Sequence, residues 1–235
     1  MNSPRLTRLL NGQSTLFLLL FLILSSGCSR YQFLSVSSQL EKNDNQEYLL
    51  ENDTVQIRYK FSGQNFPLTV NIFNKLNQPV YIDLRRSLVV MNDLQQNGTF
   101  DTYGQNDFIA PFSNVTLASH PLQEQFIPLK QADSLLARPV RTGSGKRYSF
   151  SDQTTPLYFR VILALTPNED YSYPTFYDYS FWVSGILETS YGPKSLENNV
   201  SNLPYIKKAS GFGHFMGITG VVGLVVIGSA FAPVE

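Results

Sequence analysis

The chain has 235 residues, of which 43% are hydrophobic and 15% are charged, and its 18 basic side chains balance its 18 acidic ones. A chain without an excess of basic residues lacks the electrostatic footprint of a nucleic-acid-binding protein. The single cysteine excludes an internal disulfide and metal sites of the CxxC type, and no pattern in the sequence predicts a cofactor.

The first 27 residues have the three parts of a secretory signal peptide. A basic start is followed by an apolar core over residues 16–24 and then by the small residues Ser25, Ser26 and Gly27. The apolar core is too short to cross a bilayer, which takes about 20 apolar residues. We therefore expect residues 1–27 to be removed from the mature protein.

The only cysteine stands directly after this leader. Leu24-Ser25-Ser26-Gly27-Cys28 resembles the lipobox of bacterial lipoproteins, in which the cysteine is acylated and becomes the first mature residue. The resemblance implies that Cys28 is held by membrane lipid in the bacterial cell envelope, which we take to be the outer membrane. Two or more acyl chains hold a protein stably on a bilayer. The alternative is cleavage by an ordinary leader peptidase, with Cys28 left as a free thiol.

Residues 28–54 are predicted to form a lipid-anchored polar stalk. After the short apolar stretch 31–34 they are mostly polar and show no clear period. A disordered mature terminus is the alternative interpretation.

A change to alternating polar and apolar residues marks the predicted folded domain over 55–190. Half-buried strands are predicted at Val55–Phe61, 68–72 and 80–84, and a strand covered on both sides at 88–91. Turns rich in Gly, Asn and Pro separate them, and this pattern favours an antiparallel β-sandwich.

The middle of the domain, residues 92–149, is less regular. It contains many Gly and Pro residues, which predict long loops with short strands near Val115–Leu117 and Gln125–Leu129. The apolar, β-rich run over 157–165 then predicts a central strand.

Two blocks of this domain, 74–92 and 157–188, resemble uncharacterised envelope lipoproteins of the Bacteroidota. In those proteins a strand that follows a turn of the type NKxxxPVYID, found here at 74–83, begins an immunoglobulin-like sandwich. The resemblance implies an Ig-like β-sandwich and an envelope location, and it carries no known activity.

Seven aromatic residues crowd the stretch from Tyr171 to Trp182. Such density can form a surface that binds glycan or peptide, although sandwich cores and their edges also use Tyr and Trp heavily. Because of Pro174 and the polar spacing, Tyr171, Tyr173 and Tyr177 are our candidates for an exposed binding face.

The end of the sequence is predicted to be a linker over 191–210 and then a hydrophobic, glycine-rich segment over 211–232. That segment has no formal charge and is long enough to span a bilayer as a helix. The spacing of four glycines is typical of helices that pack closely in lipid: Gly213, Gly217, Gly220 and Gly223. The alternatives are packing against the sandwich or a partner, disorder, and the removed tail of a GPI-anchored protein.

No constellation in the sequence indicates catalysis. His120 and His214 lack the spacing of metal ligands, and the stretch 141–147 departs from a P-loop because Arg147 stands where a Ser or Thr would hold magnesium. We therefore expect a protein that is not an enzyme, although a hydrolase with His120 in a cleft is an alternative.

The sequence as a whole predicts a lipid-anchored envelope protein that acts as a binding or assembly module. It would contact a membrane-protein partner through its loops, its aromatic face or its C-terminal segment, and it would not bind nucleic acid. The alternatives are a structural anchor or spacer, in which lipid and tail are both membrane attachments, and a glycan-binding surface protein.

Overall fold

The computed structural model describes residues 29–91, 94–98, 100–102, 107–129, 140–142, 145–196 and 202–209. Over these ranges the protein is mainly β, and its only helical element is the short 3-10 turn Pro193–Ser195. None of the described residues belongs to a helix with the length and apolar character that crossing a bilayer requires. Residues Tyr31–Lys207 form one compact unit, which contains both sheets.

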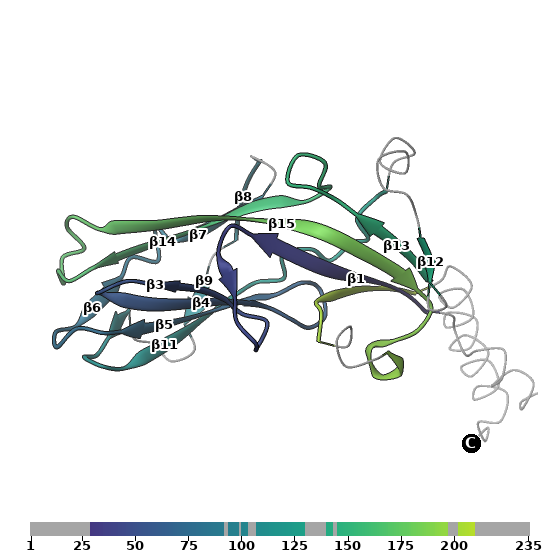
Figure 1. The fold of residues 1–235 in the computed structure, drawn as a ribbon. Helices are drawn as coiled ribbons and strands as arrows, with labels where there is room; N and C mark the ends of the chain where they lie inside the picture. The colour runs from purple at the N-terminus through teal and green to yellow at the C-terminus, as the bar shows by residue number, and fades with distance from the viewer. Residues whose placement is uncertain are drawn as a thin grey trace, which may run out of the picture. The chain divides into compact units, whose positions relative to one another are not determined.

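One sheet, called sheet B here, is a set of six antiparallel strands in the described ranges (Figure 1). In their order across the sheet they are β2 (Glu41–Lys42), β3 (Tyr48–Glu51), β4 (Val55–Phe61), β5 (Leu68–Asn74), β11 (Asn114–Ser119) and β9 (Phe100–Thr102). The first four follow one another in the chain as well as in the sheet. Local pairing therefore builds most of sheet B.

The second sheet, sheet A, contains the two longest paired strands. Its main path runs through β10 (Phe108–Ile109), β6 (Val80–Ile82), β14 (Tyr158–Thr166), β15 (Thr175–Thr189), β1 (Ser29–Ser38) and β16 (Tyr205–Ala209). Four shorter strands attach beside this path: β7 (Leu88–Met91) and β8 (Leu94–Gly98), and β12 (Val140–Thr142) and β13 (Gly145–Ser149). The first and last strands of the unit are thus neighbours in sheet A.

Alternation explains which face of each strand is buried. In β4 the apolar side chains Val55, Ile57, Tyr59 and Phe61 are buried, and the polar residues between them are not. Side chains of successive strand residues point to opposite faces, so this spacing gives β4 one apolar face. Strand β5 shows the same alternation. The strands predicted at Val55–Phe61 and 68–72 are confirmed, and the strand predicted at 80–84 covers 80–82 in the structure. Residues 88–91 form a strand as predicted, but Val89 alone is buried in it, so the expectation of cover on both sides is wrong.

The apolar faces of the two sheets meet in one core. Tyr59 of sheet B lies 5.2 Å, between ring centroids, from Phe181 of sheet A, and Phe61 lies 5.3 Å from Phe159. All four rings are buried, and full burial of a Phe side chain stabilises a fold by about 1.5–3 kcal/mol. Two antiparallel sheets around a shared core are consistent with the predicted β-sandwich.

The N-terminal part of the predicted stalk is instead a strand inside the sandwich. Strand β1 pairs antiparallel with β15, and Phe33 and Leu34 are completely buried. Residues 41–42 and 48–51 add strands to sheet B. The prediction of a polar stalk is therefore wrong for these segments, because serines between buried residues occupy the outer positions of a strand.

The predicted linker over 191–210 likewise contains a strand, β16. Ile206 is completely buried, the backbone N–H of Leu34 donates to the carbonyl of Pro204 at 2.8 Å, and the N–H of Asn65 donates to the carbonyl of Tyr205 at 2.7 Å. This segment therefore bonds to β1 of sheet A and to the connection between β4 and β5 of sheet B.

Of the two short strands predicted in the middle region, the structure contains one and lacks the other. The prediction at Val115–Leu117 corresponds to β11, whereas 125–129 is not a strand. There the side-chain amide of Gln32 accepts a hydrogen bond from the Ile127 N–H at 2.8 Å and donates to the Ile127 carbonyl at 3.1 Å. A buried side chain thus supplies the two bonds that a neighbouring strand would provide.

The central strand predicted at 157–165 is β14, which lies between β15 and the shorter strands β6 and β7. The predicted signal peptide 1–27, the predicted lipidation residue Cys28, and the segment 211–232 with Gly213, Gly217, Gly220 and Gly223 lie outside the described residues.

Candidate binding surface

Four exposed aromatic side chains gather at one end of the sandwich. They are Phe108, Phe112, Tyr173 and Phe176, with 39%, 64%, 90% and 55% of their surface exposed. They come from two segments, which lie at the same end of the sheets: 107–113, and 167–176, which comprises the connection between β14 and β15 and the first two residues of β15 (Figure 1). We call these four residues and Tyr171 the aromatic loop end.

The connection between β14 and β15 is a hydrogen-bonded loop with a defined shape. Thr166 Oγ1 and Asn168 Nδ2 both donate to the carbonyl of Ser172, at 2.7 and 3.0 Å, and the Tyr171 N–H donates to the carbonyl of Asn168 at 3.1 Å. Three bonds within so short a segment leave little freedom to its backbone. The aromatic residues that it carries are therefore held in place before any partner binds.

Three aromatic residues of this end adopt unusual backbone conformations. Phe112, Tyr171 and Tyr173 have φ angles of 52°, 58° and 49°. Positive φ is uncommon for residues other than Gly, Asn and Asp, and costs on the order of 1–3 kcal/mol per residue. Such outliers concentrate at functional sites, and two of these three residues, Phe112 and Tyr173, have exposed side chains.

The two aromatic segments are joined through Tyr171 and Tyr81. The Tyr171 hydroxyl donates to the Asp107 carboxylate, and the Tyr81 ring lies 6.3 Å from the Tyr171 ring and 6.0 Å from the Phe108 ring. The hydrogen bond to Asp107, followed by burial, raises the pKa of Tyr171 to about 12. Tyr171 therefore stays protonated at neutral pH and holds the two segments together.

The side-chain amide of a buried asparagine holds the 107–113 segment by hydrogen bonds. Asn74 is completely buried, and its Nδ2 lies 2.8 Å from the carbonyl oxygen of Gln78, 3.1 Å from that of Ile109 and 3.2 Å from that of Ala110. Its Oδ1 accepts the N–H of Leu76 at 2.9 Å. One side chain thus satisfies backbone groups from two turns at this end of the sandwich.

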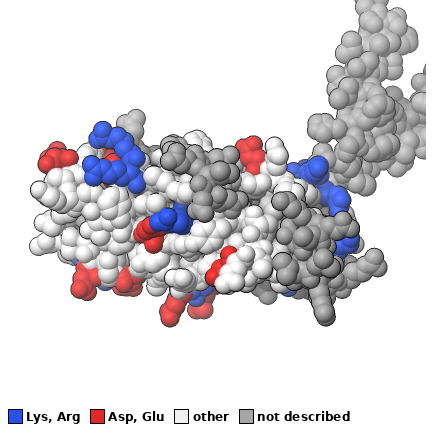
Figure 2. All heavy atoms as spheres, turned by 90° about the horizontal axis from the view of Figure 1, so that it is seen from above, with Lys and Arg blue, Asp and Glu red and all other residues white. Residues whose placement is uncertain are grey.

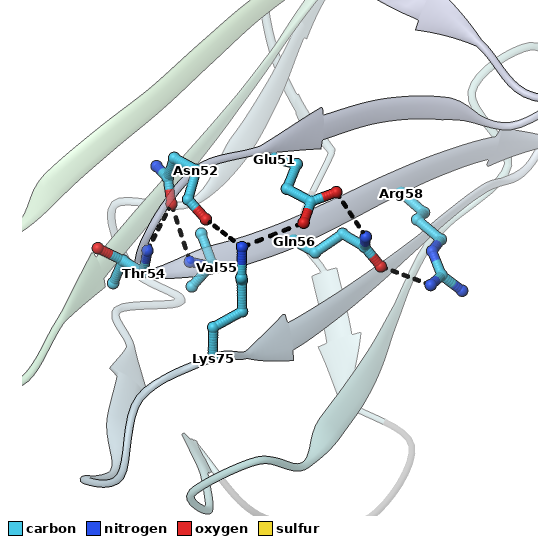
Figure 3. A network of polar contacts seen from close by, with 7 residues as sticks. All are labelled: Glu51, Asn52, Thr54, Val55, Gln56, Arg58 and Lys75. Atoms are coloured by element: carbon cyan, nitrogen blue, oxygen red, sulfur yellow. Dashed lines mark hydrogen bonds and ion pairs between the residues drawn. The ribbon is translucent and has the colours of Figure 1, made fainter.

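An exposed polar network fixes the neighbouring turn between β3 and β4 (Figure 3). Asn52 Oδ1 accepts the N–H groups of Thr54 and Val55 at 2.9 and 2.8 Å, while Lys75 Nζ donates to Glu51 at 3.1 Å and to the Asn52 carbonyl at 2.8 Å. Hydrogen bonds from Gln56 and Lys75 lower the pKa of Glu51. The network ties β3 and β4 to the end of β5.

Carboxylates accompany the exposed aromatic rings. Segments 107–113 and 167–176 contain Asp107, Glu169 and Asp170, all exposed, and no Lys or Arg. Hydrogen bonds from Ser172 lower the pKa of Asp170, so this carboxylate is ionised at neutral pH. Arg85 of the adjacent 83–87 turn is close enough to act on Tyr171 electrostatically. The two loop segments are therefore apolar and acidic, with the exposed Arg85 of the 83–87 turn beside them.

The outer face of sheet A continues from Phe176 and carries little charge. Figure 2 shows this face as mostly uncharged, and its paired strands β14 and β15 hold an ion pair between Arg160 and Asp178. Tyr158 donates a hydrogen bond from its hydroxyl to Ser180 at 2.5 Å on the same strands.

The structure places the three predicted face residues differently. Tyr173 is highly exposed and Tyr171 is partly exposed, but Tyr177 is only 8% exposed. The predicted exposure of Tyr177 is wrong, because Tyr177 shares the inward face of β15 with Phe181. The sequence reasoning missed Phe108 and Phe112, which flank Pro111 in a loop-like segment where apolar side chains would have been the signal.

The described residues contain no group of three or more His, Cys, Asp or Glu side chains that could hold a metal ion. His120 is exposed, next to the end of β11. The segment with a partial likeness to a P-loop belongs to the hairpin of β12 and β13, in which Thr142 pairs with Gly145.

Comparison with known proteins adds no relative to this picture. No protein-family model matches the chain, and no curated protein matches it either. The candidate function therefore depends on the geometry of the aromatic loop end and on the sequence.

Proposed function

We propose that this protein is a lipid-anchored cell-envelope protein that acts as a binding or assembly module for a membrane-protein partner. The aromatic loop end is its binding surface. The observation that carries the proposal is the set of exposed aromatic residues, Phe108, Phe112, Tyr173 and Phe176, on two loops that are fixed to each other. Aromatic side chains dominate the binding energy of many protein interfaces.

The rigidity of the loops supports a role in binding. Ordering a loop when it binds costs free energy, so a surface that is already ordered retains more of its contact energy as affinity. The bonds to Ser172 and the buried Asn74 provide this order. A protein interface suits three exposed Phe rings, which have no polar group, better than a sugar with many hydroxyl groups does.

The anchor is proposed from the sequence at Cys28, and the C-terminal segment 211–232 would be a second membrane contact, with Gly213, Gly217, Gly220 and Gly223 facing another helix. We further propose that the sandwich is Ig-like. The passage of the chain from β9 in sheet B to β10 in sheet A and back to β11 in sheet B supports this topology.

A structural anchor or spacer is the second candidate. It is favoured by the contact between the first and last strands of the unit, which brings the two chain ends of the sandwich together. Tyr31 and Tyr205 have ring centroids 6.0 Å apart. In this case lipid and tail would both hold the membrane, and the loop end would have no partner.

The test compares full-length protein purified in detergent from its native envelope. The double variant Tyr173→Ser/Phe176→Ser is expected to lose a membrane protein that co-purifies with wild type, while its intact mass still begins at an acylated Cys28. Tyr191→Ser is the matched control, since Tyr191 is a 50% exposed aromatic residue beyond the other end of β15.

The outcomes separate the candidates. Loss of the partner in the double variant but not in Tyr191→Ser supports the binding module. Equal partner recovery from all three proteins contradicts the aromatic loop end as the binding surface, wild type without any co-purifying membrane protein favours the spacer, and an unmodified Cys28 contradicts the lipid anchor.

A further inference from the structure

Both ends of the compact unit leave it at one end of the sandwich. The Tyr31 ring lies 6.0 Å from the Tyr205 ring, and the Phe33 ring lies 5.6 Å from it. A Cβ on Gly192 would lie 3.3 Å from the Tyr31 hydroxyl, so the segment after β15 is also close by. Tyr31 and Lys207 are the first and last residues of the unit.

The aromatic loop end lies at the opposite end of the same long strand. Strand β15 begins at Thr175, next to Tyr173 and Phe176, and ends at Thr189, which pairs with Tyr31. Its 15 residues span about 45 Å at ~3.3 Å per residue. Figure 1 shows the turn between β14 and β15 at one end of the sheets and the start of β1 at the other.

Few residues separate each membrane-directed segment from the compact unit, and their number limits how far from the Tyr31 end each segment can begin. Cys28 precedes Tyr31 by three residues, which reach at most about 10 Å, and Gly211 follows Lys207 by four residues, which reach at most about 14 Å. Both limits are much shorter than β15. Lipid on Cys28 and an inserted C-terminal segment can therefore attach to one membrane beside the Tyr31 end.

The aromatic and charged side chains of the aromatic loop end indicate the chemistry of its binding partner. Exposed aromatic rings attract cations over their faces, and carboxylates form the strongest hydrogen bonds with Arg and Lys. Asp107, Glu169 and Asp170 lie on the same two segments as the rings and outnumber Arg85, the basic side chain that acts on Tyr171 from the adjacent turn. Anionic lipid headgroups would be repelled by these groups, since membrane surfaces with such lipids attract basic segments.

We propose that the aromatic loop end points away from the anchoring membrane and docks a protein segment that carries Lys or Arg beside apolar side chains. This inference rests on the proposed membrane-anchored binding module and adds where its partner is met and what that partner's surface contains. The docking site lies about 45 Å from the membrane-proximal end, the span of β15 at ~3.3 Å per residue.

The orientation is tested by energy transfer from a labelled cysteine to acceptor lipids. Full-length acylated Tyr173→Cys and Tyr191→Cys proteins, each with one free thiol because Cys28 is blocked by lipid, are labelled with a donor dye. They are placed in vesicles of phosphatidylethanolamine and phosphatidylglycerol that contain an acceptor-labelled headgroup. We expect transfer from position 191 to be several-fold more efficient than from position 173. Equal transfer, or stronger transfer from 173, would overturn the orientation.

The partner chemistry is tested by a photo-crosslinking amino acid at position 176 in full-length protein in its native envelope. The expected adduct is a peptide with Lys or Arg next to apolar residues, and Glu169→Gln/Asp170→Asn should reduce its yield several-fold. An adduct with lipid or glycan, or with an acidic peptide, would overturn the assignment. Intact mass reports acylation separately, so loss of the anchor is distinguished from a wrong orientation or partner.

Discussion

Two buried tyrosine hydroxyls in sheet B predict opposite effects of the same substitution. The Tyr48 hydroxyl donates to the carbonyl oxygen of Val36 at 2.5 Å and so links β3 of sheet B to β1 of sheet A. The Tyr59 hydroxyl is buried in the core and has no hydrogen-bond partner among the described residues. Replacing each tyrosine by phenylalanine removes one oxygen and keeps the ring.

The expected change in the free energy of unfolding depends on whether removing the oxygen leaves another buried group without its hydrogen-bond partner. Tyr48→Phe removes the donor to a buried carbonyl, which we expect to reduce the free energy of unfolding by about 1–2 kcal/mol. Tyr59→Phe removes a buried hydroxyl that pairs with no described group, so we expect no loss, or a gain of up to about 1 kcal/mol. The two rings contribute their packing in both cases, because Tyr48 and Tyr59 both contact Phe181.

The assay is urea unfolding of the full-length protein in detergent, followed by the fluorescence of Trp182, the only tryptophan of the chain. At pH 7 the unfolding midpoint should fall for Tyr48→Phe and stay or rise for Tyr59→Phe. A loss of more than about 1 kcal/mol for Tyr59→Phe would refute the reasoning, since such a loss is the size of a hydrogen bond made by that hydroxyl.

Alkaline pH adds a second test of the same pair. Burial raises the pKa of both hydroxyls, so above about pH 10 the unfolded chain releases tyrosine protons that the native state retains. The contribution of these two hydroxyls to the free energy of unfolding is therefore fully present below about pH 10. Above that pH the free energy of unfolding falls by up to about 1.4 kcal/mol per pH unit for each such group. Each variant removes one group and should lose stability less steeply than wild type. An unchanged slope would contradict the burial argument.

Other positions give further expectations. Asn74→Ala should lower the free energy of unfolding by at least about 2 kcal/mol, because the buried carbonyl of Ile109 and the part-buried carbonyls of Gln78 and Ala110 lose their donor, and urea unfolding measures this. Gly145→Ala should also be strongly destabilising: the added Cβ would lie 2.0 Å from the Glu188 carbonyl oxygen, and φ is 154°. A melting temperature equal to wild type would contradict that clash. Asp178→Asn should change stability by less than about 1 kcal/mol, since its pair with Arg160 is exposed; a larger loss in the same assay would show that the pair carries more of the fold.

The alternation of apolar and polar residues in the sequence predicted the strands that have one buried face and one exposed face. Val55–Phe61 and Leu68–Asn74 have an apolar residue at every second position, and both appear in the structure with that face buried. The segments that escaped prediction depend on distant partners. Serines interrupt β1, and its burial arises from pairing with β15, about 150 residues later.

The sequence predicted only part of the candidate surface, because the rest of it also depends on contacts between distant residues. Tyr173 lies beside a proline in a polar stretch, which indicated exposure, whereas Tyr177 is the first buried residue of β15, and the start of that strand could not be located from composition. Phe108 and Phe112 belong to this surface because Asn74 and Tyr171 hold their segment there. Those contacts join residues more than 30 positions apart, so no local pattern reveals them.

Strand β15 pairs with β14 over residues 175–182 and with β1 over residues 181–189, and this arrangement has a mechanical consequence. A pull by a partner at the loop end away from the membrane would run parallel to β15, and it would load in shear the backbone hydrogen bonds to β14 over the first half of β15 and those to β1 over the second half. A pull that separates the two chain ends from each other would instead load the contact between β1 and β16 first. The sandwich would therefore behave as a stiff strut along its strands and would yield first at its terminal strand.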